Sequence, residues 1–212
     1  MRISTALKEE LVNSITHGIG AVLAVAGTAV AIVWAALYGS AAAVVSASIY
    51  GAMLILLYTM STLYHAFTNE KVKSIFRIFD HCSIFLLIAG TYTPFTLVTL
   101  KGAFGWTIFG IIWGFTVLGV TLNAISIEKF KRFSMVCYIA MGWLIIIAIK
   151  PMAVAIGFNA MLLLVLGGVA YTIGAIFYKM KNVPYMHGVW HLFVLAGSIL
   201  QYFSILFYVL PN

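Results

Sequence analysis

Apolar residues fill seven long segments of the chain, and short polar stretches separate them. The segments run near residues 17–38, 42–67, 75–100, 104–125, 133–149, 159–178 and 184–210. Each approaches or exceeds the roughly 20 apolar residues with which a helix spans a membrane. The alternation of apolar and polar residues that is typical of a β-barrel strand is absent. A helix, in contrast, forms all its backbone hydrogen bonds within itself and is therefore stable in hydrocarbon. The pattern predicts an all-α integral membrane protein, a bundle of seven transmembrane helices in one domain covering residues 1–212. Pro94 lies inside the third segment and should bend it.

Composition agrees with this class and excludes several others. Only 8% of the residues are charged, against about 25% in soluble domains. The net charge of +7 lies in short loops rather than in one patch, so we expect no nucleic-acid partner. Cys82 and Cys137 fall in apolar stretches and predict no disulfide framework. We also expect no signal peptide, because the first apolar run exceeds the roughly 7–15 residues of a signal core.

The loop charges predict the orientation. Ten of the twelve Lys and Arg residues fall on one side of the predicted topology, and Lys101 and Lys150 fall on the other. The ten are Arg2, Lys8, Lys71, Lys73, Arg77, Lys129, Lys131, Arg132, Lys179 and Lys181. Cytoplasmic loops carry an excess of Lys and Arg. The N-terminus is therefore expected in the cytoplasm and, after seven spans, the C-terminus outside.

Polar residues within the apolar segments gather at one depth, near the predicted cytoplasmic side. Ionisable side chains in membrane segments are costly and are usually functional. Four separate stretches contribute them: His17; Ser61 and His65; Asp80 and His81; His187 and His191. Three His and one carboxylate at one level is the ligand set of a catalytic zinc site.

Each motif also has a simpler interpretation. His187 and His191 face one way on a helix, as metal ligands or as an interfacial polar pair. Ser61 could bond its own helix carbonyl, and Asp80 could pair with Arg77 one turn earlier. His17 and His81 fit hydrogen-bonding roles better than ligand roles.

Five motifs together resemble the bacterial haemolysin III family, part of the progestin and adipoQ receptor superfamily and distantly similar to alkaline ceramidases. They are Glu10-x-x-Asn13-x-x-Thr16-His17, Ser61-Thr-Leu-Tyr-His65, Arg77-x-x-Asp80-His81, Gly90-Thr-Tyr-Thr-Pro94 and His187-Gly-Val-Trp-His191. The resemblance implies a multi-pass protein of the bacterial plasma membrane with Zn²⁺ held by His65, His187 and His191. It also implies that Asp80 holds a water at the metal or binds the metal directly. Ser61 would lie next to the ligands without binding the metal itself.

The resemblance leaves three functions open. One is a zinc-dependent hydrolase of lipid amide bonds or a membrane-lipid homeostasis factor, with Asp80 and Ser61 as catalytic residues. The others are a pore-forming haemolysin and a lipid-sensing receptor with a structural zinc. The residues favour hydrolysis over a pore, because the first, fourth, fifth and sixth segments offer almost no ionisable groups to line a channel. The partner would be a membrane lipid, either a long-chain amide or a fatty acyl group. The sequence does not set the oligomeric state, since Gly90 and Gly167–Gly168 suit close helix contacts within or between chains.

Overall fold

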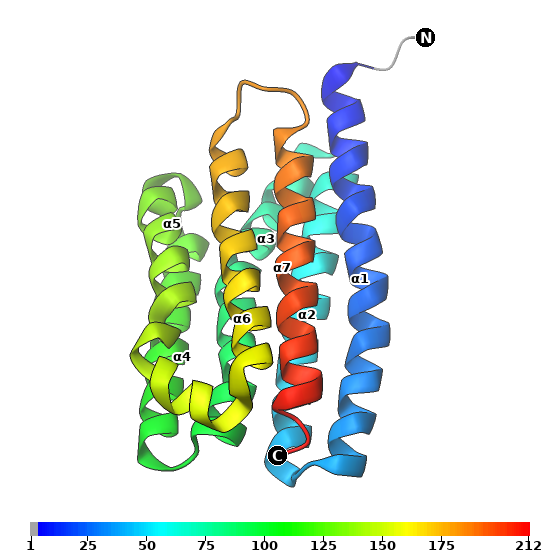
Figure 1. Ribbon diagram of the computed structural model, residues 1–212. Helices are drawn as coiled ribbons and strands as arrows, with labels where there is room; N and C mark the ends of the chain where they lie inside the picture. Colours follow the sequence, from blue (N-terminus) through cyan, green and yellow to red (C-terminus); the bar gives the residue numbers. More distant parts are fainter. Residues whose placement is uncertain (1–3) are drawn as a thin grey trace.

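The computed structural model describes residues 4–212, and every regular element in this range is a helix. Figure 1 shows them as a bundle, with the start of α1 and the end of α7 at opposite ends of the long axis. Residues 1–3 lie outside the described range; they include Arg2 and open the stretch in which we expected no signal peptide. The bounds are α1 Thr5–Tyr38, α2 Ala41–Ala66, α3 Glu70–Pro94, α4 Gly102–Ile125, α5 Ile127–Trp143, α6 Ile149–Lys179 and α7 Met186–Tyr208, with the π-helix η1 Phe95–Leu100 and the 3₁₀-helix η2 Leu144–Ala148.

Within residues 4–212, six helical segments are long and apolar enough to cross a membrane, where the sequence pattern predicted seven separate ones. The difference lies in the 53-residue run 127–179, in which α5, η2 and α6 follow one another without a loop. The connecting residues Leu144–Ala148 are all apolar, and their backbone stays helical as a tighter 3₁₀ segment. Figure 1 shows the yellow-green part of this run crossing the end of the bundle opposite the N-terminus.

Several helices begin earlier than the apolar segments because polar residues cap them. Ser4, Ser40, Asn69 and Ser126 each accept a hydrogen bond from a backbone N–H in the first turn of the helix that follows. Such caps satisfy donors that have no partner within the helix. The polar residues that precede an apolar segment are therefore helical as well, and the first helix starts at Thr5 rather than near residue 17.

Pro94 changes the geometry of the third helix, as the sequence suggested. The chain passes from α3 directly into the π-helical turn η1, because proline has no N–H to donate to the carbonyl one turn earlier. Lys101 and Gly102 then take positive φ angles of 50° and 55° and start α4 in a new direction.

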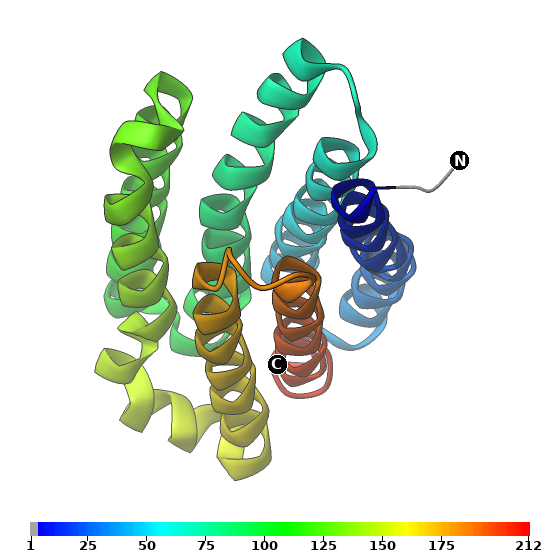
Figure 2. The same cartoon turned by 90° about the horizontal axis from the view of Figure 1, so that it is seen from above.

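Glycines bring neighbouring helices into close contact within the chain. A Cβ atom on Gly167 of α6 would lie 3.0 Å from the carbonyl oxygen of Gly197 on α7. A Cβ on Gly90 would lie 2.8 Å from the Met53 side chain of α2. Small residues let membrane helices approach closely. Figure 2 shows the result from above: α7 stands between α6 and α1, with α4 and α5 farthest from α1.

Candidate metal centre

Three histidines from two helices meet near the end of the bundle that carries the start of α1. His65 lies in the last turn of α2, and His187 and His191 lie one turn apart at the start of α7. One potential ligand nitrogen from each ring lies within 4.8 Å of the other two. His65 is 6% exposed and His191 is fully buried, so water does not solvate this group freely. The tertiary structure thus unites the three residues that the family resemblance implied as ligands.

The free nitrogens of this cluster fit a metal ion. The Nε2 atoms of His65, His187 and His191 are buried, and none has a hydrogen-bond partner within residues 4–212. Buried polar atoms without partners are rare in folded proteins because leaving them unpaired is unfavourable. Three neutral imidazoles would satisfy a zinc ion and leave a coordination position open. The cluster could therefore hold a metal ion.

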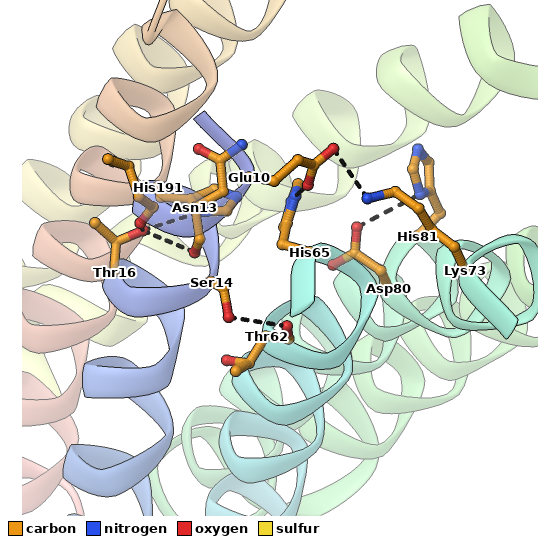
Figure 3. Close-up of polar contacts among 11 residues, drawn as sticks. Glu10, Asn13, Ser14, Thr16, Thr62, His65, Lys73, Asp80, His81 and His191 are labelled. Carbon is orange, nitrogen blue, oxygen red and sulfur yellow. Dashed lines mark hydrogen bonds and ion pairs between the residues drawn. The ribbon is translucent and has the colours of Figure 1, made fainter. Parts of the chain in front are cut away.

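Residues at the start of α1 orient two of the three rings. The Nδ1 atom of His65 lies 2.7 Å from a carboxylate oxygen of Glu10 (Figure 3). The Nδ1 atom of His191 lies 3.1 Å from the Thr16 hydroxyl and 3.2 Å from the Asn13 carbonyl oxygen. An N–H at Nδ1 that donates to these acceptors leaves the Nε2 lone pair free for a metal. Sequence reasoning quoted Glu10, Asn13 and Thr16 only as a motif and gave them no role.

His17 does not make the hydrogen bonds that the sequence suggested. Its ring stacks on His191 with centroids 3.5 Å apart and an interplanar angle of 13°. Neither of its nitrogens has a hydrogen-bond partner within the described residues, and the side chain is 2% exposed. The interpretation as a hydrogen-bonding group is wrong for the described residues, because the His17 ring packs face to face against His191 of α7 instead of meeting an acceptor. His17 braces a candidate ligand by packing.

Asp80 is buried on α3 and lies beside His65 in Figure 3, but it is not one of the three clustered side chains. Its Oδ2 atom lies 3.6 Å from Nδ1 of His81. The simple pairing of Asp80 with Arg77 does not occur, because Arg77 forms its ion pair with Glu128 at the start of α5. Within residues 4–212, the Asp80 carboxylate therefore forms no ion pair with a lysine or an arginine.

Ser61 and His81 complete the polar residues that the sequence singled out. The Ser61 hydroxyl is fully buried near the Asp80 carboxyl group and has no hydrogen-bond partner of normal geometry within residues 4–212. It does not bond its own helix carbonyl, so the simpler interpretation of this serine fails. The Nδ1 atom of His81 lies 2.9 Å from the Arg77 carbonyl oxygen, which confirms a hydrogen-bonding role for this histidine.

A large cavity reaches some of these polar residues. It has a volume of about 760 Å³ and is lined mainly by α3, α5, α6 and α7. Asp80, His81 and His187 border it at one end, and side chains such as Leu87 and Ile139 border it deeper in the bundle. Small-molecule sites in proteins commonly have roughly 300–1,000 Å³ and mostly apolar walls with few polar groups. The cavity could thus hold an apolar molecule whose polar part lies at the histidine cluster.

Known proteins resemble the chain over nearly its full length. The profile of the family described as "Haemolysin-III related" matches residues 5–202. "Hemolysin-3" of Bacillus cereus is 47% identical over 211 residues, covering 100% of this chain and 96% of that protein. The "Hemolysin-3 homolog" of Bacillus subtilis is 45% identical over 202 residues, covering 95% of each. The human "Monocyte to macrophage differentiation factor" is 27% identical over 158 residues, covering 72% of this chain and 65% of that protein. This chain is a multi-pass bacterial membrane protein and belongs to the haemolysin III family.

Proposed function

We propose that this protein is a zinc-dependent hydrolase of lipid amide bonds. One observation carries the proposal: three clustered histidines have buried, unpartnered Nε2 atoms, and one of them, His187, borders an apolar cavity together with the buried carboxylate of Asp80. His65, His187 and His191 would hold the ion. When bound, zinc would act as a Lewis acid on an amide carbonyl and on a water molecule.

The chain itself supplies the remaining groups that hydrolysis requires. Asp80 is the candidate general base, because its carboxylate borders the cavity and forms no ion pair with a lysine or an arginine within residues 4–212. The Ser61 hydroxyl lies near the Asp80 carboxyl group and could stabilise the negative charge that develops on the amide oxygen. The apolar walls would hold the acyl chain of the substrate and exclude water from it.

The proposal includes seven spans with the N-terminus in the cytoplasm and the C-terminus outside. A straight helix of 53 residues would be about 80 Å long, far more than the roughly 30 Å hydrocarbon layer. Gly157 also interrupts α6 with a φ of 76°. Both facts support two crossings within residues 127–179. The excess of Lys and Arg, ten against two, supports a cytoplasmic N-terminus.

The replacement of Asp80 by Asn tests the hydrolase. Asn keeps the size and hydrogen-bonding capacity of Asp but does not accept the proton. We expect Asp80→Asn to retain bound zinc and to hydrolyse a fluorescent long-chain acyl amide about 10²–10⁴-fold more slowly. Glu70→Gln is the matched control, because Glu70 is an exposed carboxylate at the start of the same helix. Unchanged turnover in Asp80→Asn, or no chelator-sensitive turnover in the original protein, would exclude the proposed mechanism.

A cytolysin is the second candidate, because the Bacillus cereus relative at 47% identity is named "Hemolysin-3". Dye leakage from liposomes separates the two candidates. Leakage that persists after chelation, without amide turnover, favours the cytolysin. Retained zinc without turnover or leakage favours a lipid sensor with a structural metal.

Reporter fusions test the topology. A reporter after Asn212 should be active only outside the cytoplasm, and one inserted near Lys129 only inside. The opposite activity at either position would contradict the charge argument.

A further inference from the structure

The cavity is lined by positive charge where it meets the start of α5 and the end of α6. Four exposed cationic side chains border it there: Lys131 and Arg132 from α5, Lys179 from the end of α6, and Lys181 from the turn that follows. Among the described residues that line the cavity, Asp80 is the one carboxylate. The same space is therefore apolar along its depth and cationic at its opening.

Most of these charges are not neutralised by the protein. Arg132, Lys179 and Lys181 form no ion pair with a carboxylate within residues 4–212. Lys131 lies 3.6 Å from Glu128, which is also the ion-pair partner of Arg77. Lys181 lies over the Tyr178 ring, 5.7 Å from its centroid, which leaves its charge uncompensated. Apolar walls strengthen the field of such a charged opening because they keep the local dielectric constant low.

We propose that the cavity selects a lipid that combines a long acyl chain with an anionic headgroup, either a carboxylate or a phosphate. The acyl chain would lie between α3, α5 and α6, and the four cations would hold the headgroup. The inference rests on the proposed function and narrows its substrate to acyl amides whose amine portion carries a negative charge. His187 and Asp80 border the same space, so the amide bond would lie between the chain and the headgroup.

The four cavity-lining cations differ from other cations at the same end of the bundle in their position and not in their charge. Lys71 and Lys129 are also exposed there, at the starts of α3 and α5, but they do not line the cavity. A general attraction of anionic lipids to a basic surface would depend on all of them. A headgroup site would depend on the cavity-lining residues alone.

Binding to purified, zinc-loaded protein in phosphatidylcholine nanodiscs tests the inference. The probes are a fluorescent long-chain N-acylglycine, which carries a carboxylate, and the neutral N-acylethanolamide with the same chain. We expect the acylglycine to bind more tightly. Arg132→Gln with Lys179→Gln should lower the ratio of the two affinities about 10–30-fold, since each cation near a membrane surface contributes about a factor of five. Lys71→Gln with Lys129→Gln removes the same charge from the same end and should leave the ratio within about threefold.

Three results would overturn the inference: equal binding of the two probes, equal losses in the two double variants, or an unchanged ratio in Arg132→Gln with Lys179→Gln. Competition separates the lipid from a free anion. Displacement by inorganic phosphate or short N-acetylglycine as effective as by unlabelled long-chain acylglycine would show an anion site and not a lipid site. Because binding does not require turnover, a protein that shows the expected preference but hydrolyses no amide retains this inference and loses the proposed hydrolase.

Discussion

Replacement of Glu10 should weaken metal binding although Glu10 is not a candidate ligand. Its carboxylate oxygen lies 2.7 Å from Nδ1 of His65, and its other oxygen lies 2.9 Å from Nζ of Lys73. The carboxylate fixes the proton on Nδ1, which directs the Nε2 lone pair of His65 toward the cluster. Glu10→Ala removes both this orientation and the nearby negative charge.

The magnitude follows from the type of contact and its exposure. Loss of a partner that orients a metal-bound histidine typically lowers metal affinity about 10–100-fold, which is about 1.4–2.8 kcal/mol. The Glu10 side chain is 34% exposed, so water screens part of its charge. We therefore expect the lower half of this range, about 10–30-fold, for Glu10→Ala. Glu10→Gln keeps an acceptor for Nδ1 and should lose less, about threefold to tenfold.

The assay is competition for zinc between the purified protein and a chromogenic chelator, with metal content measured independently. Glu9→Ala is the matched control: Glu9 is the neighbouring carboxylate on α1, but it accepts from the backbone N–H of Tyr185 instead of from a histidine. The control removes the same charge and one backbone hydrogen bond before α7, and it should retain zinc affinity within about threefold because no histidine nitrogen loses a partner. Equal losses in Glu9→Ala and Glu10→Ala would refute the orienting role, as would unchanged affinity in Glu10→Ala.

Three further outcomes follow from the packing. His191→Ala should lose zinc and lower the thermal midpoint together, because metal binding also stabilises the fold; a chelator should lower the midpoint of the original protein and have little further effect on this variant. His17→Phe keeps a flat ring against His191 and should retain zinc, whereas loss of zinc would make His17 a ligand. Gly119→Ala should cost about 1–3 kcal/mol because the new Cβ would overlap the Phe85 ring. Gly110→Ala has open space around it and should be neutral or slightly stabilising in the same unfolding assay.

The order and length of the apolar segments could be predicted from the sequence because they depend on local composition. Helix ends were harder to predict. Capping by residues such as Ser4 and Asn69 extends helices into polar sequence, and hydropathy does not identify that sequence as helical. The break predicted between residues 149 and 159 was also not found as a loop. The structure continues as helix from η2 into α6, because the largely apolar residues there keep their backbone hydrogen bonds within the helix.

The sequence by itself determined that this is an all-helical membrane protein with its ionisable residues at one depth, because burying charge in hydrocarbon is costly wherever it occurs. Only the tertiary structure decided which of those residues meet. His65 and Glu10 are 55 positions apart, and His191 and Thr16 are 175 apart. Their contacts depend on how each helix is rotated against its neighbours, and that rotation is set by close packing at positions such as Gly167 and Gly197. The depth of a residue in the membrane depends on the hydropathy of its own segment, whereas the assembly of a site depends on the packing of several helices.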